Sequence, residues 1–244
     1  NDTSAWATKH QLVVLTGEGC INYGDITNPQ VATAYINIGK WTPPAVNQAF
    51  QQVLAPGDIA SKGRHKVITS MEYDPRTVTN VTGDTILPGL LTIPYGELAT
   101  VRLGNEINGA ECEGLVYKLN VSPEHALLIM RYAVVLQEPG HPASEQPRFR
   151  LEILDHADNL ISPTCGNIQF IPGTNTQNWH TVGSGSEKVQ WKDWSTIGLN
   201  LSQYVNQEIK IRLSTWDCSQ TGHYGYAYFM LNCVPQAFSG FSCR

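Results

Sequence analysis

Apolar and polar residues alternate along most of the second half of the chain, and this two-residue period is the period of a β-strand. Ile209, Ile211 and Leu213 fall on one face of such a run, while Lys210 and Arg212 fall on the other. Turn sequences such as EPGHP and SPTCGN separate the runs. The pattern predicts strands over 11–16, 115–121, 126–137, 148–155, 168–172, 209–215 and 224–233.

Helical patterns are short. Residues 47–54 fit one or two turns, and residues 200–205 fit a brief turn that Asn200 or Ser202 can cap. Strands and helices do not alternate, and no repeat of 20–50 residues recurs. Several short strands joined by turns favour an all-β fold, specifically a jelly-roll β-sandwich with long connecting loops.

The 244 residues fit one β-sandwich domain, because sandwiches of this size are common. Proline and glycine interrupt every apolar run between residues 20 and 100, so we expect long connections and edge strands there. The predicted domain therefore has an irregular part, about 1–98, and a compact strand-rich part, about 99–233. Residues 1–60 either complete the sandwich or pack outside it.

Charge excludes several partner classes. The formal net charge is −5, and the 16 lysines and arginines are scattered rather than gathered in a basic stripe. Nucleic acid is therefore not an expected partner. No apolar run approaches the roughly 20 residues that span a bilayer, so no membrane insertion is expected.

Six widely spaced cysteines predict disulfides and an oxidising, extracellular compartment; six buried free thiols are the alternative. If 209–217 and 224–233 form a hairpin, its length separates Cys218 from Cys233 by roughly 25–30 Å, too far for a disulfide. Cys165 is the candidate partner for Cys218. Cys112 and Cys243 are a further candidate pair.

Two predicted loops carry polar side chains that suit a ligand. One contains His141, Glu145, Gln146 and Arg148, and the other contains Asp217, Ser219 and His223, followed by Tyr224 and Tyr226. Loops at one end of a sandwich can converge, and carboxylates beside aromatic rings bind sugars or peptides. The alternative is a buried network in which Glu145 and Asp217 accept loop N–H groups and pair with Arg148.

Catalytic motifs for nucleophilic, zinc or phosphate chemistry are absent from the sequence, so no catalytic residues are expected. A glycosidase needs two carboxylates across a cleft, for which Glu138 with Glu145 or Asp217 is the candidate pair. Trp191 and Trp194 either stack on sugar rings or pack over a sheet edge, and packing is the favoured interpretation.

Residues 191–215 resemble the penultimate part of galactose-binding-like jelly rolls. The segments RLGNEINGAECEGLVYKLNV (102–121), YAVVLQEPGHPASEQPRFRLEI (132–153) and DCSQTGHYGYAY (217–228), with RHKVIT (64–69) and DP (74–75), resemble a β-sandwich domain of large cell-surface proteins in Bacteroidetes. Such proteins often carry a sorting signal for type IX secretion. The resemblance covers about residues 60–233. It implies a secreted or outer-membrane surface location and adhesion or glycan contact, and it brings no catalytic residues.

Jelly-roll modules of this type often hold a structural Ca²⁺ through an early loop and the last strand. The early loop here offers Asn22 and Asp25, whose oxygen atoms suit that ion. Met230 stands where such modules tend to carry an acidic residue, which weakens the resemblance at this point. No other cofactor is expected.

Three functions remain after these observations. The favoured one is a non-catalytic extracellular module of an adhesin-like protein that binds a glycan or another surface protein. The others are a purely structural spacer and a polysaccharide-active hydrolase or lyase.

Overall fold

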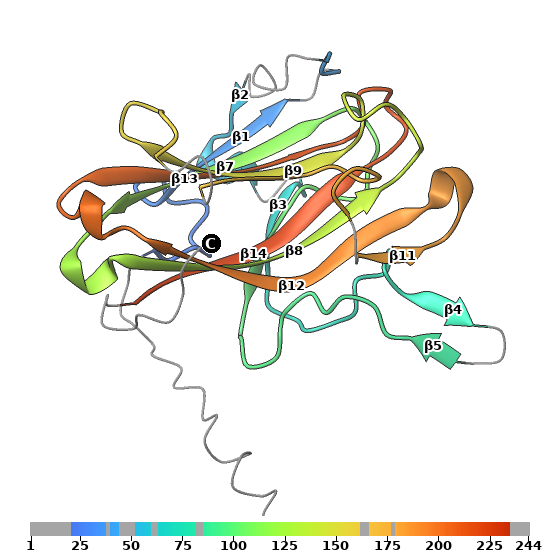
Figure 1. Cartoon of the computed structure of the whole chain (residues 1–244), viewed down its shortest axis with the longest axis horizontal. Helices are drawn as coiled ribbons and strands as arrows, with labels where there is room; N and C mark the ends of the chain where they lie inside the picture. Colours follow the sequence, from blue (N-terminus) through green and yellow to red (C-terminus); the bar gives the residue numbers. More distant parts are fainter. Residues whose placement is uncertain are drawn as a thin grey trace, which may run out of the picture.

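The protein is an all-β sandwich with a jelly-roll arrangement (Figure 1). Its structure is a computed structural model, and it describes residues 21–37, 40–43, 52–59, 63–81, 85–161, 166–176 and 179–234. Two six-stranded antiparallel sheets stack face to face, and a separate two-stranded hairpin lies beside them. The fold class predicted from the sequence is confirmed.

The first sheet, sheet A, has the strand order β10-β9-β13-β7-β1-β2. In that order its strands are β10 (Asn167–Phe170), β9 (Arg148–Asp155), β13 (Glu208–Trp216), β7 (Cys112–Asn120), β1 (Ala32–Asn37) and β2 (Gln52–Val53). The second sheet, sheet B, has the order β11-β12-β8-β14-β6-β3. Its strands are β11 (His180–Val182), β12 (Val189–Asn200), β8 (Leu127–Gln137), β14 (Gly225–Val234), β6 (Thr100–Leu103) and β3 (His65–Ile68).

The long strands alternate between the two sheets at several points along the chain, as in a jelly roll. The chain crosses between sheets from β7 to β8, from β8 to β9, from β12 to β13 and from β13 to β14. The hairpin of 209–217 with 224–233, on which the estimated separation of Cys218 from Cys233 depended, does not form, because β13 pairs with β7 and β9 while β14 pairs with β6 and β8. The loop between β13 and β14 joins the layers.

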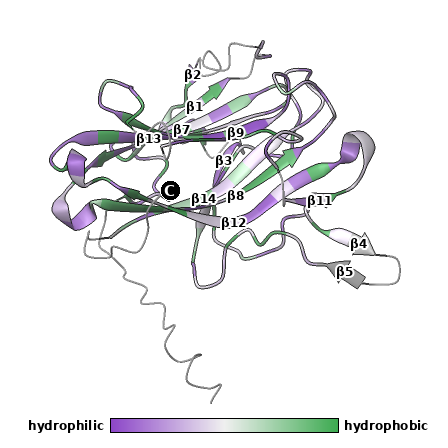
Figure 2. Ribbon diagram, viewed as in Figure 1, coloured by the Kyte–Doolittle hydropathy of each residue, from purple (hydrophilic) through white to green (hydrophobic). Residues whose placement is uncertain are grey.

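The core lies between the sheets, where the apolar faces of both meet. Ile209, Ile211 and Leu213 are buried there, as their alternation predicts. Phe229 of β14 packs edge-to-face on Tyr117 of β7, with ring centroids 5.9 Å apart. Figure 2 shows hydrophobic and hydrophilic bands alternating along strands of both sheets, as expected for a sheet with one face on the core.

A β-bulge in β12 changes which face its side chains occupy. Trp191 pairs with Val135 and Ser195 with Tyr132, so the register shifts by one residue between Lys192 and Ser195. A one-residue shift transfers every later side chain to the opposite face. Leu199 therefore faces the core, whereas Trp191 and Trp194 belong to a second apolar cluster on the outer face of sheet B.

The segment between β3 and β6 covers part of that outer face. It contains the hairpin of β4 (Thr79–Val81) and β5 (Thr85–Leu87), which extends away from the sandwich (Figure 1). Leu90 from this segment is buried in the outer cluster. Asp74 accepts hydrogen bonds from the hydroxyls of Tyr226 (2.9 Å) and Tyr228 (2.7 Å) on β14. The irregular region thus packs on the compact half.

Helix is confined to single turns in the described residues. They are α1 (Pro56–Ile59) and the 3-10 turns η2 (Pro123–His125), η3 (Gly185–Glu187) and η4 (Ser202–Tyr204). The brief turn predicted at 200–205 is present, and the Asn200 side chain accepts the Ser202 N–H at 3.0 Å. The predicted strand 11–16 and most of the predicted helix 47–54 lie outside the described residues, and Gln52–Val53 is a strand. None of the helices described has the length and apolar character needed to cross a membrane.

The sequence places edge strands in residues 20–100, and the structure agrees for β2 and β3, each of which ends its sheet. β1 differs, because it lies inside sheet A between β7 and β2. The prediction of one domain over residues 1–244 remains a prediction.

Candidate functional site

The two polar loops predicted to converge do meet at one end of the sandwich. The backbone N–H of Ser219 donates to the carbonyl of Glu145 at 3.0 Å, and the Gln220 amide donates to the Glu145 carboxylate. The rings of His141 and His223 lie edge-to-face with centroids 5.1 Å apart. Of the expected site residues, these two imidazoles and Glu145 keep partial solvent exposure.

Asp217 occupies a different position from the one expected of a ligand-binding carboxylate. Its side chain is buried, at 3% exposure, and it accepts the backbone N–H groups of Glu111 (3.3 Å) and Gly225 (3.2 Å). Its carbonyl accepts the indole N–H of Trp41 at 3.0 Å. The expectation that Asp217 reaches a ligand does not fit this burial, whereas the alternative of loop N–H acceptance does.

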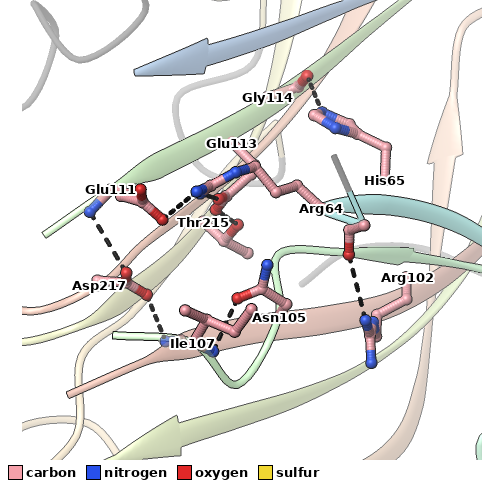
Figure 3. Close-up of polar contacts among 12 residues, drawn as sticks. Arg64, His65, Arg102, Asn105, Ile107, Glu111, Glu113, Gly114, Thr215 and Asp217 are labelled. Atoms are coloured by element: carbon pink, nitrogen blue, oxygen red, sulfur yellow. Dashed lines mark hydrogen bonds and ion pairs between the residues drawn. The ribbon is translucent and has the colours of Figure 1, made fainter. Parts of the chain in front are cut away.

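Asp217 belongs to a buried group of carboxylates around one cation (Figure 3). Arg64 lies between Glu111 and Glu113, and its Nη1 is 2.7 Å from Glu113 Oε1. Thr215 donates to the other Glu113 oxygen at 3.2 Å. Burial raises the pKa of Glu113 to about 7, and burial with the nearby Glu113 charge raises the pKa of Asp217. This carboxylate network joins β7 to β13 inside the protein.

Arg148, Tyr224 and Tyr226 are also buried. Arg148 donates from Nη2 to the carbonyls of Ala143 and Ser144, both at 2.9 Å. It forms no ion pair with Glu145 or Asp217 among the described contacts, so the expected pairing is wrong. Burial lowers the Arg148 pKa to about 10.

Tyr226 is fully buried, and its hydroxyl donates a hydrogen bond to Asp74. The ring of Tyr224 stacks on the ring of Tyr226 with centroids 5.8 Å apart. Neither tyrosine presents an open face of the kind on which a sugar stacks.

The predicted Cys165–Cys218 disulfide is corrected by the structure. Cys218 is a free buried thiol, and so is Cys112, which also removes the Cys112–Cys243 pair. Cys165 and Cys243 lie outside the described residues. Cys233 is disulfide-bonded, and its partner is neither of the two free thiols. The prediction that Cys218 and Cys233 stay apart is confirmed.

The early loop proposed for calcium forms a hydrogen-bonded turn. The backbone N–H of Asp25 donates to the Asn22 carbonyl at 2.9 Å, and the Asp25 carboxylate accepts the Asn28 amide at 3.1 Å. In the part of the chain that the structure describes, Asp25 belongs to no group of three acidic, histidine or cysteine side chains. Calcium binding by Asn22 and Asp25 remains a prediction.

An aromatic pocket lies on the outer face of sheet B, between β12 and the segment that covers this face. The cavity measures about 520 Å³. We call it the aromatic pocket; its lining is Tyr73, Pro88, Gly89, Leu91, Pro94, Tyr95, Arg131, His180, Trp191, Asp193 and Trp194. These residues come from three separated stretches of the chain, and the β12 bulge supplies three of them.

The aromatic groups of this pocket are held in fixed positions. Trp194 donates its indole N–H to the Leu91 carbonyl at 2.7 Å, which fastens the covering segment to β12. The exposed ring of His180 stacks on Trp191 with centroids 4.0 Å apart. Tyr95 is 76% exposed at the rim. The rigid sheet therefore supports an aromatic surface that solvent reaches.

Polar groups lie among these rings. Arg131 pairs with Glu97 at 2.9 Å, so its charge is balanced before any ligand arrives. The exposed Asp193 accepts the Trp194 backbone N–H at 2.7 Å. Trp191 is buried, and its indole N–H has no hydrogen-bond partner among the described residues. Hydrogen-bonding capacity therefore remains in the pocket.

Sequence reasoning missed this pocket in part. Trp191 and Trp194 were noted as residues that stack on sugars or pack, and they do pack, within the pocket wall. The run WKDW (191–194) carries a usable signal, because two tryptophans three residues apart cannot share a face of a regular strand unless a bulge intervenes. The contribution of Tyr73 and Tyr95 depends on tertiary packing.

A second cavity of about 480 Å³ lies over sheet A and is lined by Lys118, Lys210 and Arg212 among other residues. Two of these cations are already paired. Lys210 contacts Asp158 at 2.9 Å, and Arg212 contacts Glu152 at 2.7 Å. The aromatic pocket is therefore the stronger candidate for ligand binding.

Searches of protein-family models and of curated proteins found no match. Among solved structures, the chain is similar to TmCBM61 in complex with β-1,4-galactotriose, with 11% identity, a TM-score of 0.33 and coverage of 70% of this chain and 83% of that one. It is similar to CBM27-1 of Caldicellulosiruptor saccharolyticus in complex with mannohexaose, with 9% identity, a TM-score of 0.31 and coverage of 59% and 76%. The glycoside hydrolase domain Endo-D from Streptococcus pneumoniae R6 matches with 11% identity and a TM-score of 0.30 over 68% of this chain, which spans 21% of that protein.

Proposed function

We propose that this chain is a non-catalytic carbohydrate-binding module that holds a neutral oligosaccharide in the aromatic pocket. The observation that carries the proposal is the lining of that pocket, where the exposed Tyr73 and Tyr95 of the covering segment stand beside hydrogen-bonding groups of sheet B. Ligand sites are usually concave and aromatic, with a few fixed polar groups. The pocket has all three features.

The chemistry of the lining favours a neutral sugar. The apolar C–H face of a pyranose ring stacks on an aromatic face, and Tyr95 offers an open one. Asp193 can accept sugar hydroxyls, and Arg131 can donate to them from its pair with Glu97. Because the Arg131 charge is neutralised and Asp193 is an anion, an acidic sugar gains little here.

The non-catalytic part of the proposal rests on where the carboxylates lie. Hydrolysis of a glycosidic bond uses two carboxyl groups that face each other across the substrate. Among the residues that line the aromatic pocket, Asp193 alone carries a carboxylate, so the lining does not supply a pair. Glu138, considered as a partner for Asp217, is buried and engaged by Lys188, Gly140 and Gln146, and Asp217 lies in the carboxylate network.

The setting that we propose for this binding is extracellular. The resemblance of residues 60–233 to surface-protein domains of Bacteroidetes supports a module of an adhesin-like protein exported by type IX secretion. Glycan is the favoured partner over another surface protein, because the aromatic pocket is a concave site of small-molecule size.

The test compares pocket and non-pocket variants in affinity gel electrophoresis against neutral plant and microbial polysaccharides. Tyr95→Ala should weaken retardation by about tenfold, the usual consequence of removing an aromatic anchor. Leu98→Ala is the matched control, because Leu98 is 90% exposed three residues away and does not line the pocket. Equal retardation of the two variants would reject the pocket, and no retardation of the wild type by any polysaccharide would favour a structural spacer.

A further inference from the structure

Three metal-binding side chains meet where the β8–β9 and β13–β14 loops converge, away from the aromatic pocket. The residues are His141, Cys218 and His223, and one ligand atom from each lies within 4.8 Å of the other two. The Cys218 Sγ and the His223 Nδ1 are 3.2 Å apart. We call these residues the thiol–imidazole cluster. It is the one group of this kind among the residues that the structure describes.

Backbone hydrogen bonds hold each member of the cluster in place. The Cys218 N–H donates to the His223 carbonyl at 2.8 Å, which closes the loop between these two residues. The Gln146 amide donates to the His141 carbonyl at 3.0 Å. Because the Ser219 N–H also donates to the Glu145 carbonyl, the two loops are joined beside the cluster. The side chains therefore converge from a preorganised backbone.

The cluster also contains unused ligand capacity. The His141 Nδ1 is buried and has no hydrogen-bond partner among the described residues. Cys218 is a free thiol although its residue is fully buried. A buried polar atom without a partner is unfavourable, and native structures usually satisfy such atoms with protein, water or an ion.

The donor set and its spacing fit a zinc ion. Zinc bonds to cysteine sulfur at about 2.3 Å and to histidine nitrogen at about 2.0–2.1 Å, so tetrahedral ligand atoms stand about 3.3–3.6 Å apart. The Cys218–His223 separation of 3.2 Å is close to this range, and the ligand atom of His141 lies within 4.8 Å of both. Thiolate and imidazole ligands favour zinc over calcium or magnesium, which select oxygen.

We propose that His141, Cys218 and His223 form a Zn²⁺ site that fastens the β8–β9 loop to the β13–β14 loop. Three protein ligands leave the fourth position to solvent. The half-exposed histidines provide the path by which the ion reaches the buried sulfur.

The proposal is tested on the full chain after treatment with EDTA and a reductant. Zn²⁺ is titrated calorimetrically, and Co²⁺ is added separately as a spectroscopic probe. We expect one equivalent of Zn²⁺, a rise in the melting temperature, and a cobalt–thiolate charge-transfer band. Cys218→Ser should remove that band and lower Zn²⁺ affinity by about 100-fold or more, since even residues behind the ligands contribute 10- to 100-fold.

Matched variants separate binding from folding. Cys112→Ser removes the other free buried thiol described and should leave one equivalent of Zn²⁺ and the cobalt band unchanged. His141→Gln removes a partly exposed ligand and should lower affinity even if Cys218→Ser fails to fold. Binding of less than about 0.1 equivalent of Zn²⁺ by the wild type would overturn the proposal. A cobalt complex without the thiolate charge-transfer band would overturn it too. Unchanged affinity in the folded His141→Gln protein would overturn it as well.

Discussion

Replacing Glu113 with Gln should make the stability of this protein depend on pH in a new way. Glu113 is 2% exposed and contacts Arg64 and Thr215 within the carboxylate network. Burial raises its pKa from 4.5 to about 7. Glutamine keeps the shape of the neutral acid and removes the titration, so the difference between variant and wild type reports Glu113 together with its effect on the pKa of Asp217.

The sign follows from where the proton is held more tightly. The folded state binds the Glu113 proton up to about pH 7, while the unfolded chain releases it near pH 4.5. The stabilising contribution of Glu113 is therefore fully present below pH 4.5, and it is lost as the pH rises through about 7. The full shift corresponds to about 3 kcal/mol, and most of it falls between pH 5 and pH 8.

His65 acts in the opposite direction and explains why a difference is needed. Burial lowers the His65 pKa from 6.5 to about 4, so the unfolded chain takes up a proton that the folded state refuses. Stability from this group decreases as pH falls from 6.5 to 4, by about 2 kcal/mol between pH 8 and pH 5. These two contributions to stability therefore change with pH in opposite directions in the wild type.

The assay is urea denaturation of the wild type and Glu113→Gln at pH 5 and pH 8. Between pH 5 and pH 8 the stability of the variant relative to the wild type should rise by about 2–3 kcal/mol, because the His65 contribution is common to both proteins. Glu106→Gln is the control, since its side chain is 40% exposed in a surface pair with Arg102. A variant-minus-wild-type difference that is equal at both pH values would refute the buried, raised-pKa description of Glu113.

Three further substitutions test the packing. Phe229→Ala removes a fully buried ring in contact with Tyr117 and should cost about 3–5 kcal/mol in urea denaturation; a cost below about 1 kcal/mol would contradict the core assignment. Gly104→Ala should destabilise the protein more than Gly140→Ala. Both glycines have positive φ, but a Cβ at Gly104 would lie 2.7 Å from a backbone carbonyl oxygen, whereas a Cβ at Gly140 would meet open space. Equal melting temperatures of the two variants would contradict this expected order. Trp194→Phe removes the hydrogen bond to the Leu91 carbonyl, which contributes about 1 kcal/mol. The backbone amides of residues 88–95 should then exchange faster with solvent deuterium. Unchanged exchange would show that this hydrogen bond does not hold the segment in place.

Alternation in the sequence was sufficient to place the long inner strands. The predicted strand 148–155 coincides with β9, and 209–215 lies within β13. Both strands bury one face and alternate regularly, so the period is readable. β12 is harder to read from alternation, because its bulge breaks the two-residue period after Trp191. β3 and β6 have four residues each, too few for a clear period.

The candidate site was less readable than the fold. Convergence of the two polar loops followed from the sandwich, but the burial of Asp217 and Arg148 did not, because a polar residue in a loop is more often exposed. The aromatic pocket joins Tyr95 to Trp194, which are 99 positions apart in the sequence. The packing of residues 88–95 over sheet B brings such positions together. The thiol–imidazole cluster was hidden for another reason, since Cys218 had been assigned to a disulfide.

The measurement that tests the central claim most directly is glycan-array binding of the chain, with calcium and then with EDTA. Binding through the aromatic pocket predicts specific signals from neutral hexose oligosaccharides that sulfated or uronic-acid glycans do not give. Loss of those signals in EDTA, with recovery on adding Ca²⁺ but not Zn²⁺, would assign the early loop with Asn22 and Asp25 a structural calcium. A blank array under both conditions would contradict carbohydrate binding.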